Sequence, residues 1–176
     1  GHYFFPYAGQ WRMTPRHPYT RWNTLPDGAP GEYLTDRLTD EAVKFIEQNQ
    51  KRPFFLYLSH YAVHTPLQAK KKLIAKYEAK PASRNHGNAT YAAMIESVDQ
   101  SVGRVLKRLE ELKLTKNTVV IFTSDNGGHG RITSHHPLRG NKGTFYEGGI
   151  RVPLVVKWPG VVAPGSACTT PVISAD

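Results

Sequence analysis

The chain has 176 residues, 39% of them hydrophobic, which suffices for one moderate core and predicts one domain or part of one. No apolar run is long enough to span a membrane, and no signal peptide opens the sequence. Lysine and arginine outnumber aspartate and glutamate by 23 to 14, and the net charge of +9 favours anionic partners such as nucleic acid, phosphate or sulfate esters. The sequence starts at Gly1 and stops after an apolar stretch, so we expect both ends to be cuts in a longer chain whose remainder could balance this charge.

The first third of the chain predicts an irregular segment, a helix and a strand. Residues 1–33 are rich in aromatic residues, proline and glycine without any period, which indicates an ordered but irregular segment. Thr35 or Thr39 can cap a helix that runs to about Asn49. Residues 53–58 (Pro-Phe-Phe-Leu-Tyr-Leu) are continuously apolar, as in a strand that is buried on both faces.

The remainder alternates helices with apolar strands. A basic helix is predicted from about residue 68 to 79, followed by a polar loop over 81–88. Thr90 can cap the longest helix, whose apolar period continues to Leu112, and strands are predicted over 118–123 and 152–158. This order predicts an α/β sandwich with a largely parallel central sheet flanked by helices, and no internal domain boundary.

Asp125 and Asn126 directly follow the predicted strand 118–123. Ligand sites of open α/β sheets lie beyond the carboxyl ends of strands, and carboxylate and amide oxygens suit Ca²⁺ or Mg²⁺. The alternative is structural, because Asp-Asn-Gly is also a good turn sequence.

His64 follows the predicted strand 53–58 and would lie at the same sheet edge as Asp125 if the strands are parallel. A histidine there could donate a proton to a leaving group. The alternative is a structural histidine before the Thr65-Pro66 turn.

Residues 139–149 form a glycine-rich stretch around Lys142. Flanking glycines let the backbone approach closely and leave the ammonium free for an anionic group. Taken alone, the stretch is better explained as a glycine-rich loop with a solvated lysine.

Together, three stretches resemble the type I sulfatase family, part of the alkaline-phosphatase-like superfamily. They are Phe54 to Leu58 leading to His64-Thr65-Pro66; Thr123-Ser124-Asp125-Asn126-Gly127; and Gly140 to Pro153, followed by Trp158-Pro159-Gly160. The resemblance covers roughly residues 34–172 and implies that residues 1–176 are an interior part of a single catalytic domain, with 34–176 as its α/β portion.

The resemblance implies a role for each matching residue. Asp125 and Asn126 fall on two metal ligands of the family, with Ca²⁺ expected rather than Mg²⁺. Lys142 falls on the lysine that contacts the sulfate group, and His64 on the histidine proposed to protonate the leaving alcohol.

Other parts of the family's active site have no counterpart here. The family's nucleophile is a formylglycine made from Cys or Ser in a Cys-x-Pro/Ala-x-Arg motif by a formylglycine-generating enzyme. Cys168 lacks that context and comes too late in the chain, so we expect it to be a small apolar residue. The family's early Asp-Asp ligands and its Gly-Lys-Trp-His-type segment are also absent, so this chain alone should be inactive.

The resemblance therefore implies hydrolysis of a sulfate ester, with a sulfated carbohydrate as the expected substrate, in an exported protein (periplasmic, secreted or lysosomal). One alternative is a phosphonate monoester or phosphodiester hydrolase of the same superfamily. Another is a non-catalytic anion-binding module, although no nucleic-acid-binding motif is present.

Two further features allow two interpretations each. His129, His135 and His136 could line the pocket or face solvent. Asn88-Ala89-Thr90 has the form of a glycosylation sequon, or is the cap of the long helix.

Overall fold

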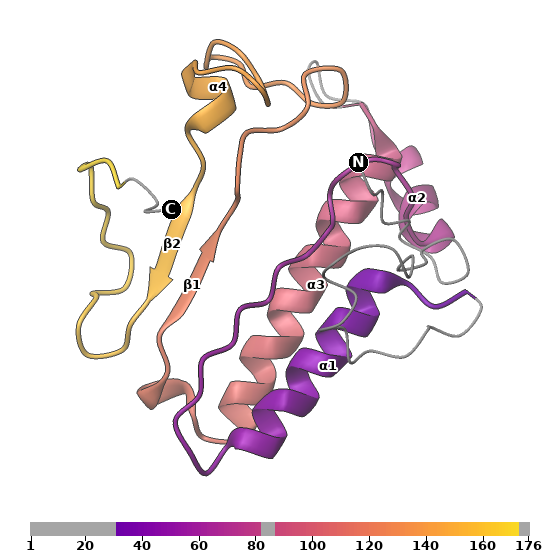
Figure 1. The fold of residues 1–176 in the computed structure, drawn as a ribbon. Coiled ribbons are helices and arrows are strands. Elements are labelled where there is room, and N and C mark those ends of the chain that lie inside the picture. Colours follow the sequence, from indigo (N-terminus) through magenta and orange to yellow (C-terminus); the bar gives the residue numbers. More distant parts are fainter. Residues whose placement is uncertain (1–30, 82–86, 173–176) are drawn as a thin grey trace, which may run out of the picture.

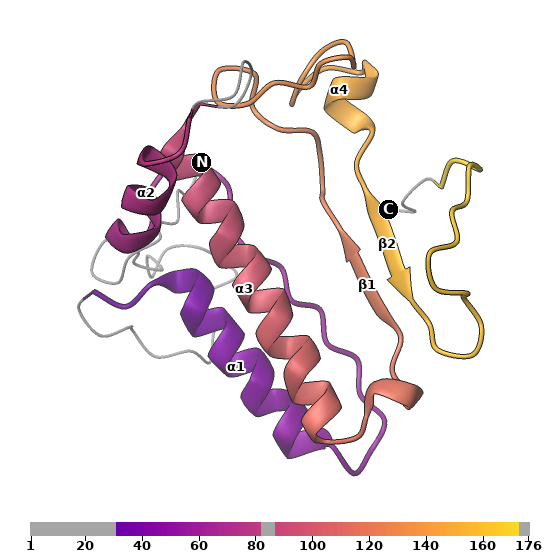
Figure 2. The same ribbon diagram turned by 180° about the vertical axis from the view of Figure 1, so that it is seen from behind.

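A computed structural model describes residues 31–81 and 87–172, so the irregular segment expected over residues 1–33 lies almost entirely outside the described residues. The elements in chain order are α1 (Leu34–Asn49), α2 (Lys71–Glu78), α3 (Ala89–Glu111), the 3-10 helix η2 (Thr115–Asn117), β1 (Val120–Thr123), α4 (Glu147–Ile150) and β2 (Leu154–Lys157). Three helices lie on one side of the molecule and the two strands on the other (Figures 1 and 2).

Helix α3 is the centre of the helical half, and both α1 and α2 pack against it. The buried residues Ala93 and Met94 of α3 join Ala69 and Leu73 in one apolar cluster. Ile46 is the most deeply buried large side chain of α1, with 1% of its surface exposed. The helical periods seen in the sequence therefore mark the faces by which these helices contact one another.

The helices begin near the predicted residues but with different caps. Helix α1 begins at Leu34, and Thr35 and Thr39 are buried inside it, so the prediction that either caps the helix was wrong. Helix α3 is capped by Asn88, whose side chain accepts a hydrogen bond from the Tyr91 N–H at 2.9 Å, and not by Thr90. Asparagine and threonine are both favourable N-cap residues, with asparagine the better of the two, so neighbouring polar residues compete for this position.

The described sheet is an antiparallel ribbon. β1 pairs with β2 in the register Val120↔Lys157 to Thr123↔Leu154, so the predicted largely parallel sheet is not what these two strands form. A parallel pair needs a long crossover, usually a helix, to return the chain to the start of the first strand. The connection over residues 124–153 contains only the short helix α4. It does not carry the chain back to the start of β1, so β2 begins beside the last residue of β1 and runs in the opposite direction.

Residues 53–58 are extended but are not part of a sheet. No backbone hydrogen bond joins them to another segment of the described ranges, which corrects the prediction of a strand here. Phe54 packs edge-on against Phe45 of α1, with ring centroids 5.8 Å apart, whereas Phe55 and Tyr57 are 86% and 79% exposed. Burial on both faces was therefore also wrong for this structure, because the described helices cover one side of the segment only.

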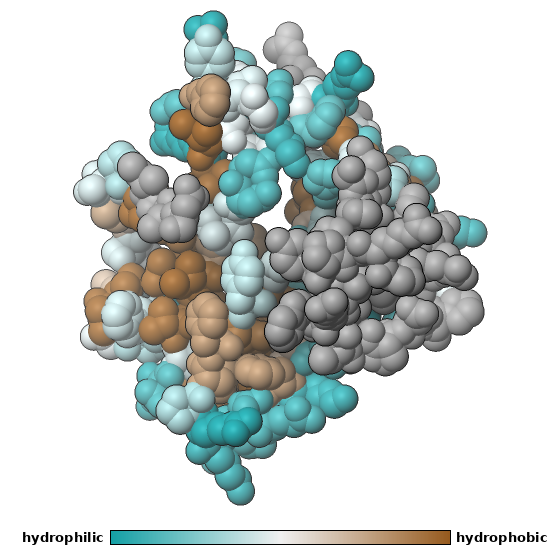
Figure 3. Space-filling view, in the orientation of Figure 1, coloured by the Kyte–Doolittle hydropathy of each residue, from teal (hydrophilic) through white to brown (hydrophobic). Residues whose placement is uncertain are grey.

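The ribbon is likewise open to solvent on much of its surface. Ile121, Leu154 and Val155 are exposed, and Figure 3 shows apolar side chains gathered over the strands. Residues 51–60 run in the same direction as β1, toward the end of the molecule that carries the loops after β1 (Figures 1 and 2). Across 31–81 and 87–172, no helix is long and apolar enough to cross a membrane.

Candidate active site

The first candidate loop directly follows β1 and carries Asp125 and Asn126. An aspartate that only stabilises a turn accepts a backbone N–H with its side chain. Asp125 is exposed, and its carboxylate has no hydrogen-bond or ion-pair partner in the described part of the chain. Asn126 is half-buried. Its backbone carbonyl, not its side chain, accepts a hydrogen bond from the Ser124 hydroxyl at 3.1 Å. The Asp125 carboxylate and the Asn126 amide oxygen are therefore left for a ligand.

The second candidate loop presents Lys142 between two glycines in the left-handed region. Gly140 has φ +84° and Gly143 has φ +87°, values that an L side chain rarely adopts. The Lys142 side chain is exposed and has no carboxylate partner within the described ranges. The ammonium is thus held out from a tightly turned backbone and is free to meet an anion.

Backbone hydrogen bonds join the two loops into one unit. The Gly127 N–H donates to the Gly149 carbonyl at 2.8 Å, and the Lys142 N–H donates to the Gly128 carbonyl at 3.0 Å. A side chain at Gly127 would collide with the carbonyl of Gly148, so this approach requires glycine. The structure thereby brings the backbone that carries Asp125 and Asn126 against the backbone that carries Lys142.

His64 is exposed and lies on a separate segment. Its Nδ1 is 2.8 Å from the Thr65 carbonyl, so a proton on Nδ1 is donated there and Nε2 is left as the free ring nitrogen. No hydrogen bond joins His64 to either candidate loop among the described residues. The orientation suits proton transfer through Nε2, although the described chain does not itself connect His64 with Asp125 or Lys142.

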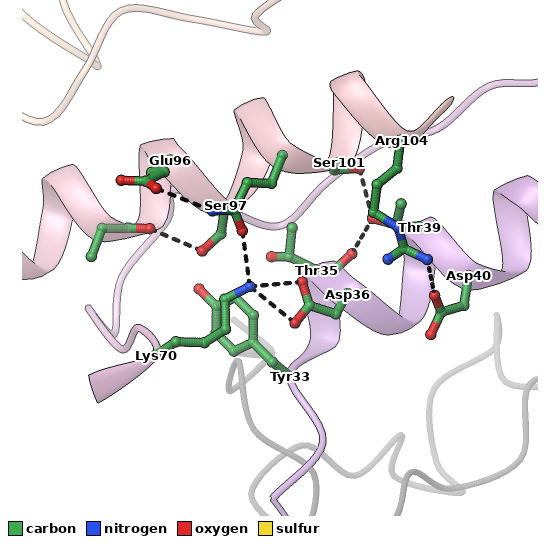
Figure 4. A network of polar contacts seen from close by, with 12 residues as sticks. Tyr33, Thr35, Asp36, Thr39, Asp40, Lys70, Glu96, Ser97, Ser101 and Arg104 are labelled. Atoms are coloured by element: carbon green, nitrogen blue, oxygen red, sulfur yellow. Dashed lines mark hydrogen bonds and ion pairs between the residues drawn. The ribbon is translucent and has the colours of Figure 1, made fainter. Parts of the chain in front are cut away.

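Two polar contacts anchor the segment that carries His64 onto the helices. On one side, His60 Nε2 lies 3.0 Å from the Ser101 hydroxyl, which is 2.6 Å from the Thr39 hydroxyl. On the other side, the Lys70 ammonium lies 3.1 Å from both carboxylate oxygens of Asp36, and its bonds to α1 and α3 are drawn in Figure 4. The segment between residues 60 and 70 is therefore held at both ends.

Burial gives His60 a pH dependence that can be measured. Desolvation lowers the pKa of His60 below 6.5, because the charged imidazolium is disfavoured away from water, and its Nδ1 is buried without a partner in the described ranges. Below pH 6.5 the unfolded chain binds a proton that folded His60 resists, so the free energy of unfolding should fall as pH drops through 6.5 toward the folded-state pKa.

The prediction is tested with His60→Gln in the full-length protein, since a glutamine amide can still form a hydrogen bond with Ser101 but does not titrate. The urea midpoint should fall less between pH 7.5 and 5 in the variant than in the wild type. The difference at pH 7.5 measures the packing change alone. Identical pH dependences in the two proteins would contradict the assignment.

Comparison with known proteins identifies the family. A sequence model of the family described as Sulfatase matches residues 2–175. The chain belongs to the sulfatase family. A sulfatase of Formosa agariphila is 42% identical over 96% of this chain, and human steryl-sulfatase is 39% identical over 81%.

Solved sulfatase structures share the fold. The crystal structure of Ps i-CgsB is 40% identical and has a TM-score of 0.71 over 81% of this chain. The same protein in complex with k-i-k-neocarrahexaose gives a TM-score of 0.68 over 78% of this chain. The chain spans 32% of the length of the Formosa protein and of Ps i-CgsB, and 24% of steryl-sulfatase.

As part of a calcium site, Asp125 and Asn126 have suitable chemistry but are too few. Ca²⁺ takes six to eight oxygen ligands, and these two residues offer a carboxylate and an amide oxygen that the fold leaves unused. Within residues 31–81 and 87–172, no group of three or more His, Cys, Asp or Glu side chains could hold a metal ion. The described residues thus supply only part of any such ligand set.

Arg139 lies at the start of the glycine-rich stretch, and no motif predicts a role for it. The Arg139 guanidinium lies over the Tyr146 ring, with its central carbon 3.8 Å from the ring centroid. No sequence pattern predicts that an arginine will stack on a tyrosine across a glycine-rich loop.

The three histidines that could line the pocket or face solvent differ in burial. His135 is half-buried with its ring against Gly128, whereas His129 and His136 are exposed. Cys168 is exposed.

Proposed function

We propose that the full-length protein is a sulfatase that hydrolyses sulfate esters of a carbohydrate. The observation that supports this most strongly is the junction of the two loops. It sets the side-chain oxygens of Asp125 and Asn126, which have no partner in the described residues, beside the loop of Lys142, whose ammonium has none there either. A cation site next to an isolated ammonium is suited to an oxyanion such as a sulfuryl group. Membership of the sulfatase family supports a sulfuryl group as this anion.

Each residue of this chain then has a task that its environment permits. Lys142 would contact the sulfuryl oxygens as a point charge, since no carboxylate in the described residues neutralises it. His64 would donate a proton from Nε2 to the departing oxygen, while Nδ1–H stays bonded to the Thr65 carbonyl. That bond orients the ring for the transfer.

Asp125 and Asn126 would hold Ca²⁺ together with ligands from elsewhere in the full-length protein. A bound Ca²⁺ would add positive charge beside the sulfate group. The formylglycine nucleophile would also come from outside residues 1–176, because Cys168 is followed by Thr169-Thr170-Pro171 and not by the modification motif. We expect its formation to require a formylglycine-generating enzyme, and export of the protein belongs to the same proposal.

Similar proteins support a carbohydrate substrate. Besides the complex of Ps i-CgsB with k-i-k-neocarrahexaose, an N-acetylgalactosamine-6-O-sulfatase of Bacteroides thetaiotaomicron is 34% identical over 76% of this chain. Steryl-sulfatases have comparable identity, so identity alone does not separate sugar from steroid. We favour a sugar because the solved structure with a TM-score of 0.71 is of the protein that binds the oligosaccharide.

The proposal is tested by turnover of nitrophenyl sulfate and nitrophenyl phosphonate by the full-length protein, co-produced with a formylglycine-generating enzyme. We expect preferential cleavage of the sulfate ester. The 176-residue chain, purified free of host sulfatase, should show no turnover, because it lacks the nucleophile and part of the metal site. Preference for the phosphonate would instead indicate the sister hydrolase. Salt-sensitive binding of polyanions without any turnover would indicate a non-catalytic module.

A further inference from the structure

The loop region around Lys142 carries positive charge only. Residues 126–146 contain Arg131, Arg139 and Lys142 together with three histidines, and no aspartate or glutamate. One cation would suffice for one sulfuryl group. The additional arginines therefore need a separate explanation.

On helices α1 and α3, the arginine charges are used by the fold. Helix α1 and α3 arginines have carboxylate partners: Arg37 with Glu41 at 3.1 Å, Arg108 with Glu47 at 2.9 Å, and Arg104 with Asp40. Arg139 has neither a carboxylate partner nor a side-chain hydrogen bond within the described ranges. Its charge does not stabilise a contact with another charged group of this fold.

The geometry of Arg139 suits anion binding. The guanidinium lies over the Tyr146 ring at 3.8 Å, and both residues are solvent-exposed. Stacking occupies one face of the guanidinium plane and leaves its N–H groups, which lie in that plane, free to donate. It also restricts a flexible side chain before any ligand binds, so less conformational entropy is lost on binding.

Arg139 is also tied to the candidate active site. Its carbonyl accepts a hydrogen bond from the Gly148 N–H at 2.7 Å, and Gly148 precedes Gly149, which binds Gly127 of the first loop. Arg139 stands three residues before Lys142 in the same loop. A ligand that extends from Lys142 along this loop would meet the guanidinium edge.

We infer that Arg139, stacked on Tyr146, binds a second anionic group of the substrate, so that the enzyme prefers carbohydrates that carry another sulfate or a carboxylate beside the ester it cleaves. This inference rests on the proposed sulfatase function. Sulfate and carboxylate both present two oxygens to a guanidinium edge, which two parallel N–H groups can bind. Arg139 is therefore a specificity residue, whereas Lys142 contacts the group that is removed.

The test uses full-length, formylglycine-containing enzyme and three matched disaccharides. The first carries only the cleaved sulfate, the second a further sulfate on the neighbouring sugar, and the third a carboxylate there. Wild-type enzyme should show kcat/KM about 10-fold higher for the second or third than for the first, and Arg139→Ala should abolish the preference, mainly through KM. Whichever of the two anions is preferred identifies the group recognised.

Control variants separate this role from a general charge effect. Lys116→Ala removes an exposed cation of η2 and should keep the full preference. Arg139→Lys keeps the charge but not the paired N–H groups, so part of the preference should be lost. Tyr146→Phe retains the ring under the guanidinium and should retain the preference, whereas Tyr146→Ala should weaken it.

Equal kcat/KM for all three disaccharides in the wild type would overturn the inference even if Arg139→Ala did not fold. A preference that persists in folded Arg139→Ala would also overturn it. Absence of nitrophenyl sulfate turnover would instead count against the proposed function. In that case, calorimetric binding of the same disaccharides to wild type and Arg139→Ala still decides the role of Arg139.

Discussion

Replacing His64 by alanine in the full-length, formylglycine-containing enzyme should slow cleavage of a sugar sulfate by about 10²–10⁴-fold, the usual contribution of general acid catalysis. The same change should cost much less for nitrophenyl sulfate. A nitrophenolate leaves readily as an anion, whereas a sugar alkoxide needs a proton in order to leave. The structure supports this role because the Nδ1 bond to the Thr65 carbonyl leaves Nε2 as the free nitrogen on an exposed ring.

Single-turnover rates of ester cleavage are the appropriate measurement, since a later step can mask the effect in steady-state turnover. Comparison of the two substrates serves as the internal control, because loss of folding would slow both equally. Equal losses on both esters in a folded variant would show that His64 positions the sulfate or supports the fold. The general acid would then have to be another residue.

Substitutions in the joined loops should separate metal binding from sulfate binding. Asp125→Ala is expected to weaken Ca²⁺ binding sharply, because it removes a charged ligand that has no other partner in the described chain. Asn126→Ala should do so more mildly, since the amide oxygen is neutral. Lys142→Ala should leave the metal in place, raise KM and lower kcat by about 10²-fold, because the sulfuryl oxygens lose a cationic partner during transfer.

Calorimetric titration of the full-length protein with Ca²⁺ measures the first two effects, and Lys142→Ala serves as the matched control in the neighbouring loop. Steady-state kinetics with saturating Ca²⁺ measure the third. Unchanged Ca²⁺ affinity in Asp125→Ala would contradict the proposed metal site. A loss of Ca²⁺ affinity in Lys142→Ala that matched the loss in Asp125→Ala would show that the loops act as one structural unit, not as two separate ligand groups.

Local periodicity predicted the helical half well. The apolar period of α3 continued to Leu112, and the structure ends this helix at Glu111 with Leu112 as its C-cap. Helix α1 ends at Asn49, as predicted. These residues could be identified because a helix that packs on one face repeats its apolar positions along a short stretch of sequence. Caps were less certain because several polar residues near a helix start can serve equally well.

Sheet partners could not be read from the same kind of pattern. Continuous apolar runs over 53–58 and 118–123 indicated buried strands, but an apolar run does not say which segment pairs with it or whether both faces are covered. In the described residues, 53–58 is unpaired and β1 pairs antiparallel with β2. Whether two successive strands are parallel depends on whether their connection carries the chain back to the start of the first strand. Residues 124–153 contain no crossover helix that would do so.

The sequence by itself determined the family, the helices and the residues that carry the proposed chemistry, because motif order and helical periods are properties of the chain alone. Only the tertiary structure decided which of those residues meet. Gly127 and Gly149 lie 22 positions apart, yet a backbone hydrogen bond joins these two residues, and only glycine permits that approach. The stack of Arg139 on Tyr146 and the anchoring of His60 by Ser101 are likewise contacts across turns or between elements. Such contacts depend on how separate segments fold back on one another, and no local pattern of residues predicts which segments come together.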